Sequence, residues 1–173
     1  MKSLLDENAI HQTLARLAGE MAASIPNGCP VGVVGIRRRG DELARRLMPL
    51  LENCGLSDVA YGSLDITLYR DDLAEIGPSA VVRTTEIDFD VAGRYLFLID
   101  DVIFTGRSVR AALAALIDLG RPKAIRLVVL VDRGGREYPI QPDFVGIRTS
   151  SDDAHVTVSL SETDGRDLVE IAP

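Results

Sequence analysis

The sequence predicts an α/β fold in which a central, mostly parallel sheet is flanked by helices. Short apolar runs alternate along the chain with segments whose apolar residues recur at helical spacing. Glycine, proline and aspartate residues separate these segments where helices and strands usually begin or end. Strands that alternate with helices form parallel βαβ units. The 173 residues are expected to form one domain, since domains have about 100–200 residues.

Two helices and two strands are predicted in the first half of the chain. Apolar residues from Asp6 to Ile25 follow helical spacing, with Asp6 as the N-cap and Pro26-Asn27-Gly28 as the stop. A buried strand is predicted for Val31 to Ile36, and a second helix for Glu42 to Cys54. Apolar and polar residues alternate from Leu64 to Leu68, which predicts a strand with one exposed face.

The second half begins with a charged segment, Arg70 to Pro78, whose broken periodicity predicts a mobile loop. Tyr95 to Ile99 and Ile125 to Val131 are predicted to be buried strands, separated by a helix over Ser108 to Leu119. Alternating apolar residues predict late strands around residues 156–160 and 168–171.

Charge and composition exclude several classes of protein. The net charge of −7 argues against an ordinary nucleic-acid-binding protein, which carries a basic total or a basic patch. Of the 19 basic residues only Lys2 and Lys123 are lysine, so lysine-dependent mechanisms have almost no candidates. Arginine instead suits bidentate binding of phosphate oxygens.

The sequence also predicts a cytoplasmic protein without a membrane segment. No apolar run approaches the roughly 18 residues of a membrane span, and the first residues lack the apolar stretch of a signal peptide. Two scattered cysteines, Cys29 and Cys54, do not suggest a disulfide framework.

The most informative stretch is LFLIDDVIFTGRSVRAAL, residues 96–113. A buried parallel strand brings Asp100 and Asp101 to the carboxyl edge of the sheet, where open α/β folds bind ligands. Two adjacent carboxylates can accept hydrogen bonds from vicinal hydroxyls, or lie near a divalent cation. The chain then turns through Thr105-Gly106 into a helix whose free N–H groups form an anion site, with Ser108 as a further donor. A diol contact beside a phosphate site describes a ribose 5-phosphate.

A strand that ends in two acids has another interpretation. It could be the magnesium-binding strand of a P-loop NTPase, but that class also needs a G-x-x-x-x-G-K-[ST] loop, which the sequence lacks. The G-x-G-x-x-G pattern of a Rossmann dinucleotide site is absent as well. The ribose phosphate is therefore favoured on spacing, with the alternative still open.

LFLIDDVIFTGRS, residues 96–108, closely resembles the signature of type I phosphoribosyltransferases. The resemblance implies their fold, with a small hood over about residues 131–160, and binding of 5-phosphoribosyl-1-pyrophosphate (PRPP). It implies that the acidic pair holds the ribose hydroxyls and that the turn before the helix holds the 5-phosphate. The PRPP-binding residues implied in this stretch are Asp100, Asp101, Val102, Ile103, Phe104, Thr105, Gly106, Arg107 and Ser108.

Three further segments are similar to the PyrR-type branch of that family. They are GIRRRG at residues 35–40, DITLYRDD at residues 65–72 and LVDRGGREYPI at residues 130–140. Members of this branch are uracil phosphoribosyltransferases that in some bacteria also regulate pyrimidine operons by binding leader RNA. The resemblance extends over nearly the whole chain.

The resemblance implies a role for each of these segments. GIRRRG is similar to the pyrophosphate loop, so Arg38 and Arg39 would face the leaving group. DITLYRDD is similar to the mobile loop, about residues 69–80, whose Arg70 would complete the pyrophosphate clamp on closure and exclude water. An ordinary solvated turn remains an alternative for the first loop, and an ordinary charged hairpin tip for the second. LVDRGGREYPI lies where the family places the hood that binds the base, and the candidates there are Val131, Asp132 and Arg133.

The resemblance also indicates which base is used. Purine enzymes of this type usually carry an acid just before the Thr-Gly, where this chain has Phe104. An orotate enzyme would usually have a lysine in its mobile loop, and no lysine lies between Lys2 and Lys123. Uracil would then attack PRPP and release pyrophosphate to give UMP, with Asp100, Asp101 and Arg70 as the candidate catalytic residues. Mg²⁺ is expected near the two aspartates, carried by PRPP and without a direct protein ligand.

A second function, RNA-binding attenuation of pyrimidine genes in response to UMP, follows from the family and has weaker local support. RNA binding needs several cations on one face. The candidates are Arg16, Arg136 and Arg148, together with Arg133, which a homodimer or larger oligomer could pool into one patch. A catalytically silent sensor of UMP remains a third possibility. His11 and His155 lie far from these motifs and are not expected to act in catalysis.

Overall fold

The computed structural model describes residues 1–77, 84–149 and 155–172. The elements of its first half are β1 (Lys2–Asp6), α1 (Glu7–Ser24), β2 (Val31–Ile36), α2 (Gly40–Asn53), β3 (Ala60–Leu64), the 3-10 turn η1 (Thr67–Tyr69) and α3 (Leu73–Ile76). The elements of its second half are β4 (Tyr95–Ile103), α4 (Arg107–Leu119), β5 (Ala124–Asp132), β6 (Phe144–Arg148), β7 (His155–Ser159), α5 (Ser161–Asp164) and β8 (Leu168–Ala172).

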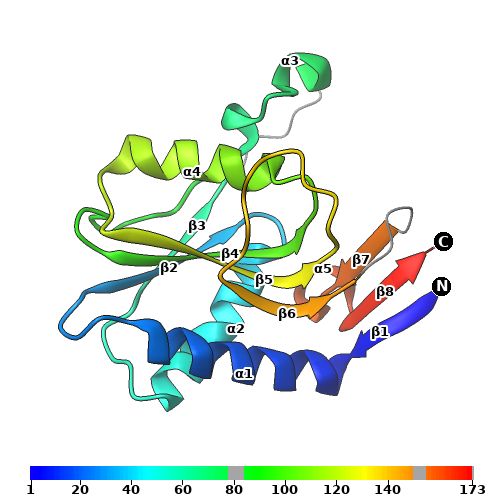
Figure 1. Cartoon of the computed structure of the whole chain (residues 1–173), viewed down its shortest axis with the longest axis horizontal. Helices are drawn as coiled ribbons and strands as arrows, with labels where there is room; N and C mark the ends of the chain where they lie inside the picture. Colours follow the sequence, from blue (N-terminus) through cyan, green and yellow to red (C-terminus); the bar gives the residue numbers. More distant parts are fainter. Residues whose placement is uncertain (78–83, 150–154, 173) are drawn as a thin grey trace.

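These strands form two sheets (Figure 1). The larger sheet has five strands in the order β3-β2-β4-β5-β6, and every neighbouring pair is parallel. The smaller sheet has three antiparallel strands in the order β1-β8-β7. The predicted α/β fold with a central parallel sheet is confirmed.

Helices cover both faces of the large sheet: α1 and α2 lie on one side, and α4 lies on the other (Figure 1). Strand β4 shows why the sheet needs both layers. Tyr95, Phe97 and Ile99 pack into the core beneath α1 and α2, whereas Leu96 and Leu98 pack beneath α4. A strand that is buried on both faces reads as a continuous apolar run, as this one does in the sequence.

Helix α1 begins and ends where its sequence signals indicate. The Asp6 side chain caps it, since Oδ1 accepts a hydrogen bond of 2.8 Å from the Ala9 N–H. The helix ends at Ser24, just before Pro26. Ile10, Leu14 and Leu17 bury its inner face, so the predicted amphipathic helix is confirmed.

The strand predicted over Leu64 to Leu68 is wrong in its position. The observed strand, β3, ends at Leu64, and the chain continues into a 3-10 turn. The reason lies in Asp65, whose Oδ1 accepts a hydrogen bond of 2.9 Å from the Thr67 N–H. Such a side-chain turn bends the backbone away from a strand. Strands β1 and β6 were not predicted.

The smaller sheet joins the two ends of the described chain (Figure 1). The predicted late strands are β7 and β8, and β1 pairs with β8. Within the expected hood, about residues 131–160, strand β6 belongs to the large sheet and β7 to the small one. Residues 78–80 of the expected mobile loop lie outside the described residues. None of the helices that the structure describes is long and apolar enough to cross a bilayer.

Candidate active site

Three loops meet at the carboxyl edge of the large sheet. They follow β2, β4 and β5, which are neighbours in the sheet and run parallel. The register pairs Gly35 with Ile99 and Ile103 with Asp132. The arginine loop after β2, the acidic pair in β4 and the segment after β5 therefore lie at one edge, where open α/β sheets bind their ligands.

The acidic pair lies inside the last part of β4. The Asp100 residue is only 6% exposed, and its Oδ1 accepts a hydrogen bond of 3.0 Å from the Asp101 N–H. The Val102 N–H donates in the same way to Asp101 Oδ1, at 2.8 Å. Burial raises the pKa of Asp100 well above its usual range, and the negative charge of Asp101 raises it further. Two carboxylates in so little water favour a partner that brings hydroxyl donors or positive charge.

A tight turn connects the acidic pair to α4. Gly106 has φ +90°, which a residue with a Cβ rarely adopts. The N–H of Arg107, the first helical residue, donates to Thr105 Oγ1 at 3.2 Å. Residues 102–109 and Asp100 line a cavity of about 180 Å³. The free N–H groups at the start of α4 make this cavity suitable for an anion such as a phosphate.

The arginine loop after β2 packs directly on the acidic strand. A Cβ on Gly40 would lie 2.5 Å from the carbonyl oxygen of Ile99 and 3.2 Å from Cα of Asp100. Only glycine permits this approach, because real side chains do not tolerate such distances. The loop that carries Arg37 to Arg39 is thereby held beside the acidic pair.

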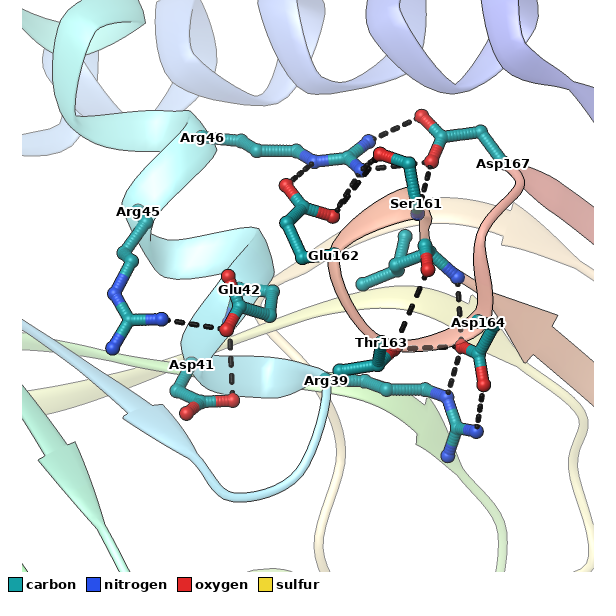
Figure 2. Close-up of polar contacts among 11 residues, drawn as sticks. Arg39, Asp41, Glu42, Arg45, Arg46, Ser161, Glu162, Thr163, Asp164 and Asp167 are labelled. Atoms are coloured by element: carbon teal, nitrogen blue, oxygen red, sulfur yellow. Dashed lines mark hydrogen bonds and ion pairs between the residues drawn. The ribbon is translucent and has the colours of Figure 1, made fainter.

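The three arginines of this loop have different surroundings. Arg37 points to β3, where Nη2 donates to Ser63 Oγ at 2.8 Å. Arg38 is exposed and makes no ion pair with any residue that the structure describes. Arg39 forms a two-pronged ion pair with Asp164 of α5, which lies between strands β7 and β8 of the small sheet (Figure 2). Of the two arginines expected at the leaving group, one is therefore open to solvent and the other is held by a carboxylate.

The segment after β5 lies against the turn from Phe104 to Gly106 that leads into α4, which is called the phosphate turn below. Val131 and Asp132 are buried at the end of the strand, and the Arg133 N–H donates to the Ile103 carbonyl at 3.1 Å. The Arg133 guanidinium lies over the Phe104 ring, 3.9 Å from its centroid. Its Nε is buried without a hydrogen-bond partner among the residues described. The three candidates for the base site are thus adjacent to the proposed sugar site.

Arg70 lies in a loop that does not reach the acidic pair in this conformation. Its guanidinium pairs with Asp72, two residues away, at 2.6 Å. The base of the loop is fixed to α4, because Arg110 Nη2 donates to the Tyr69 carbonyl at 2.6 Å. Arg107 also pairs with Asp71 of this loop. A role for Arg70 at the pyrophosphate requires that it exchange Asp72 for the ligand.

The arginines considered for RNA binding fall into two groups. Arg16 of α1 donates to the carbonyls of Val145 and Gly146 in β6, and Arg148 is exposed at the end of the same strand. Arg136 instead points inward, where Nη2 pairs with Asp132 Oδ1 at 2.8 Å. Arg16 and Arg148 therefore lie on the α1–β6 side of the molecule, while Arg136 is engaged in a buried pair.

Comparison with known proteins identifies the family. The family model described as phosphoribosyl transferase domain matches residues 1–163. The bifunctional protein PyrR of Roseiflexus sp. is 49% identical over 165 residues, which cover 95% of this chain and 90% of the relative. The chain belongs to the PyrR family of phosphoribosyltransferases. A second relative, the bifunctional protein PyrR of Deinococcus radiodurans, is 46% identical over 171 residues, which cover 98% of this chain and 93% of the relative.

Solved structures of more distant enzymes share the fold of this PyrR family member. A hypoxanthine-guanine phosphoribosyltransferase from Bacillus anthracis superposes with a TM-score of 0.74 at 16% identity, covering 99% of this chain and 98% of the other. The hypoxanthine phosphoribosyltransferase of Trypanosoma cruzi gives a TM-score of 0.76 at 21% identity, covering 99% and 95%. The type I phosphoribosyltransferase fold implied by the signature is confirmed. The family model and the PyrR relatives show that the chain is a phosphoribosyltransferase.

The acidic pair is also compatible with the Mg²⁺ that phosphoribosyltransferases generally use. No group of three or more His, Cys, Asp or Glu side chains is arranged to hold a metal within residues 1–77, 84–149 and 155–172. Mg²⁺ is commonly bound by one or two carboxylates together with substrate phosphates and water. Asp100 and Asp101 fit such an ion when it arrives with a diphosphate.

Sequence reasoning missed the contribution of the small sheet to this site. Asp164 of α5 was not among the candidates, although it binds an arginine of the site. The two residues are 125 positions apart in the chain, and no local pattern connects them. An acid followed by glycine at the end of a short polar segment gives no signal that distinguishes it from an ordinary surface turn.

Proposed function

We propose that this PyrR family member makes UMP and pyrophosphate from uracil and PRPP. The observation that carries the proposal is the continuity of β4 with the turn into α4. This segment presents a largely buried pair of carboxylates and a cavity of about 180 Å³, which has room for a phosphate, within ten residues of each other. A ribose 5-phosphate needs both features at that separation.

Each part of the edge has a role in binding PRPP. Asp100 and Asp101 accept hydrogen bonds from the ribose hydroxyls, and the turn from Thr105 to Ser108 holds the 5-phosphate. Arg38 and Arg39 lie at the pyrophosphate. Mg²⁺ carried by PRPP supplies positive charge to the leaving group. The burial that raises the pKa of Asp100 favours such a cation, because the carboxylates lack water to stabilise their charge.

The reaction is a displacement at the anomeric carbon. Uracil N1 forms the new bond to that carbon, the bond from the carbon to the pyrophosphate oxygen breaks, and the N1 proton passes to the departing pyrophosphate. Glycosyl transfers pass through a state with positive charge on the sugar ring, so the protein contributes positioning and charge stabilisation. Arg70 would leave Asp72 and bind the pyrophosphate when the loop closes, which would also exclude water.

Phe104 supports a pyrimidine rather than a purine. Its ring, covered by the Arg133 guanidinium at 3.9 Å, stands where purine enzymes of this type usually carry an acid. An aromatic ring cannot exchange a proton with the base as a carboxylate can. Val131, Asp132 and Arg133 would then bind the uracil edge, through backbone groups as well as side chains.

An assay of product formation tests the proposal. The protein is incubated with PRPP, Mg²⁺ and one base at a time, namely uracil, orotate, hypoxanthine or guanine, and nucleotide formation is measured. We expect UMP from uracil and no product from the other three. Product from another base alone would contradict the choice of base and leave the sugar site intact.

RNA-binding regulation responsive to UMP is a second candidate function, favoured by the position of Arg16 and Arg148. Arg16 Nη2 donates a hydrogen bond of 2.6 Å to the carbonyl oxygen of Gly146 in β6. Gly146 lies two residues before Arg148 in the same strand, so both cations belong to one side of the subunit. A homodimer or larger oligomer would bring two such sides together. We expect Arg148→Gln to weaken binding of the protein's own leader mRNA, with affinity that falls as salt rises, and to leave UMP formation unchanged. Light scattering checks the oligomeric state.

A further inference from the structure

We propose that Asp164 is a positioning residue for Arg39. It holds one edge of the guanidinium so that the other edge is available to the pyrophosphate. This inference rests on the proposed function of the arginine loop and adds a residue from the small-sheet side of the molecule to it. The ion pair is drawn in Figure 2, where Arg39 at the start of α2 meets the turn that contains Asp164.

The geometry of the pair leaves part of the guanidinium open. Nε of Arg39 donates to Asp164 Oδ2 at 3.1 Å, and Nη2 donates to Oδ1 at 2.9 Å. This uses the Nε–Nη2 edge of the planar fork, and Nη1 has no partner in the part of the chain that the structure describes. An arginine has five N–H donors, so a phosphate oxygen can bind at the Nη1 side without breaking the pair.

Asp164 is itself firmly held. Its Oδ2 also accepts hydrogen bonds from the Leu160 N–H at 2.9 Å and from Thr163 Oγ1 at 2.7 Å. The hydrogen bonds from Arg39, Leu160 and Thr163 keep the pKa of Asp164 well below its usual range. The carboxylate therefore stays charged and keeps its place in the turn.

A second arginine fixes this turn to α2. Arg46 donates to Glu162 at 2.6 Å, to Ser161 at 3.1 Å and to Asp167 Oδ1 at 2.8 Å (Figure 2). Arg39 thus binds the middle of one short segment, residues 161–167, and Arg46 binds both of its ends. Arg46 supports the segment without belonging to the arginine loop, which makes its partners useful controls.

Arg39 needs such support because a strong competing site is close by. Gly40 packs on the backbone of Ile99 and Asp100, and the negative charge of Asp101 acts on the Arg39 guanidinium. Without Asp164, the arginine would turn to the acidic pair and occupy the place of the ribose hydroxyls and Mg²⁺. Asp164 also reduces the side-chain freedom that Arg39 must lose when the ligand binds.

The test compares Asp164→Asn with Asp167→Asn, which weakens the same segment through Arg46 and does not touch Arg39. For each protein we would measure kcat, the KM values for PRPP and uracil, and inhibition by pyrophosphate. For Asp164→Asn we expect the KM for PRPP and the inhibition constant for pyrophosphate to rise about tenfold. The reason is that the variant loses the charge-assisted contact that orients Arg39. The KM for uracil should stay within about twofold, and Asp167→Asn should leave all four values within that range.

A double substitution separates positioning from general support. In an Arg39→Gln background, Asp164→Asn should have no further effect on pyrophosphate binding, because its target is gone. Equal losses in Asp164→Asn and Asp167→Asn, additive losses in the double variant, or unchanged pyrophosphate binding in Asp164→Asn would each overturn the inference.

If Asp164→Asn does not fold, Asp164→Glu replaces it, since the longer acid keeps the charge and moves Arg39. Absence of turnover in the unsubstituted protein would instead refute the proposed function, and pyrophosphate binding would then be measured by calorimetry.

Discussion

Arg136 forms a nearly buried ion pair with Asp132, one of the three residues proposed to bind the base. Arg136 Nη2 lies 2.8 Å from Asp132 Oδ1, and the side chains are only 13% and 11% exposed. The same guanidinium donates to the carbonyls of Ile140 and Phe104 at 2.8 and 3.0 Å. Arg136 thus connects the end of β5, the following loop and the phosphate turn.

Replacing Arg136 with methionine should therefore affect stability first. The change leaves the buried Asp132 carboxylate without its cation, which typically costs about 3–5 kcal/mol. Urea unfolding of Arg136→Met should show that loss in the free energy of unfolding. Arg148→Met, at an exposed arginine of β6, is the control and should change it by less than about 0.5 kcal/mol. Normal stability in Arg136→Met would mean that the pair is not needed for folding.

The acidic pair gives a prediction for catalysis. Asp101→Asn keeps the size of the side chain and removes the charge that would meet PRPP and its Mg²⁺. We expect kcat/KM for PRPP to fall by about 10²–10³, as for other groups that stabilise a developing charge, with little change in melting temperature. Asp88→Asn replaces an exposed aspartate outside the site and should retain full activity. Full activity in Asp101→Asn would remove this carboxylate from the site.

The close packing of Gly40 on β4 gives a prediction for both folding and activity. In Gly40→Ala the new methyl group would meet the Ile99 carbonyl oxygen at 2.5 Å, so the arginine loop must move away from the acidic pair. We expect a loss of about 1–3 kcal/mol in the free energy of unfolding, and a higher KM for PRPP. Gly19→Ala is the matched control, because nothing lies within 4 Å of its Cβ. That helical position should gain roughly 0.5–1 kcal/mol.

The Asp164 carboxylate gives a prediction for acid stability. Its folded pKa lies below the usual value because Arg39, Leu160 and Thr163 donate hydrogen bonds to it. A lowered folded pKa stabilises the fold above the unfolded pKa of about 3.9, and this contribution is lost as the pH falls through the folded value. Between about pH 4 and pH 2 the free energy of unfolding should therefore fall less steeply in Asp164→Asn than in the unsubstituted protein. Parallel curves would show that the carboxylate gains nothing from its donors on folding.

The sequence was most informative where the controlling contacts are local. The cap at Asp6, the apolar run of β4 and the turn at Gly106 are all set by residues within a few positions, and each was predicted. Strand β3 was placed too late in the chain because Leu64, Ile66 and Leu68 alternate like a strand, whereas the Asp65 side chain bends the backbone just after Leu64. Strand β1 could not be predicted, because it has only five residues and its partner lies at the other end of the chain.

The same distinction applies to the candidate site. Asp100, Asp101 and the turn after them lie on one segment, so their arrangement follows from a strand that enters a helix. The surroundings of Arg39 and Arg136 depend on carboxylates from other elements, and the sequence does not indicate which acid each arginine meets. Arg136 was considered for RNA binding because of the family resemblance and its charge, whereas its neighbours hold it inside the subunit.

The pairing of β1 with β8 determines the order in which the site can be completed during translation. The strand at residues 2–6 is translated long before its partner at residues 168–172. The ribosome therefore exposes the acidic pair and the arginine loop well before Asp164 and the sheet that carries it. A nascent chain can form the sugar pocket before Arg39 is oriented, and a product that stops before residue 164 would lack the carboxylate that holds Arg39.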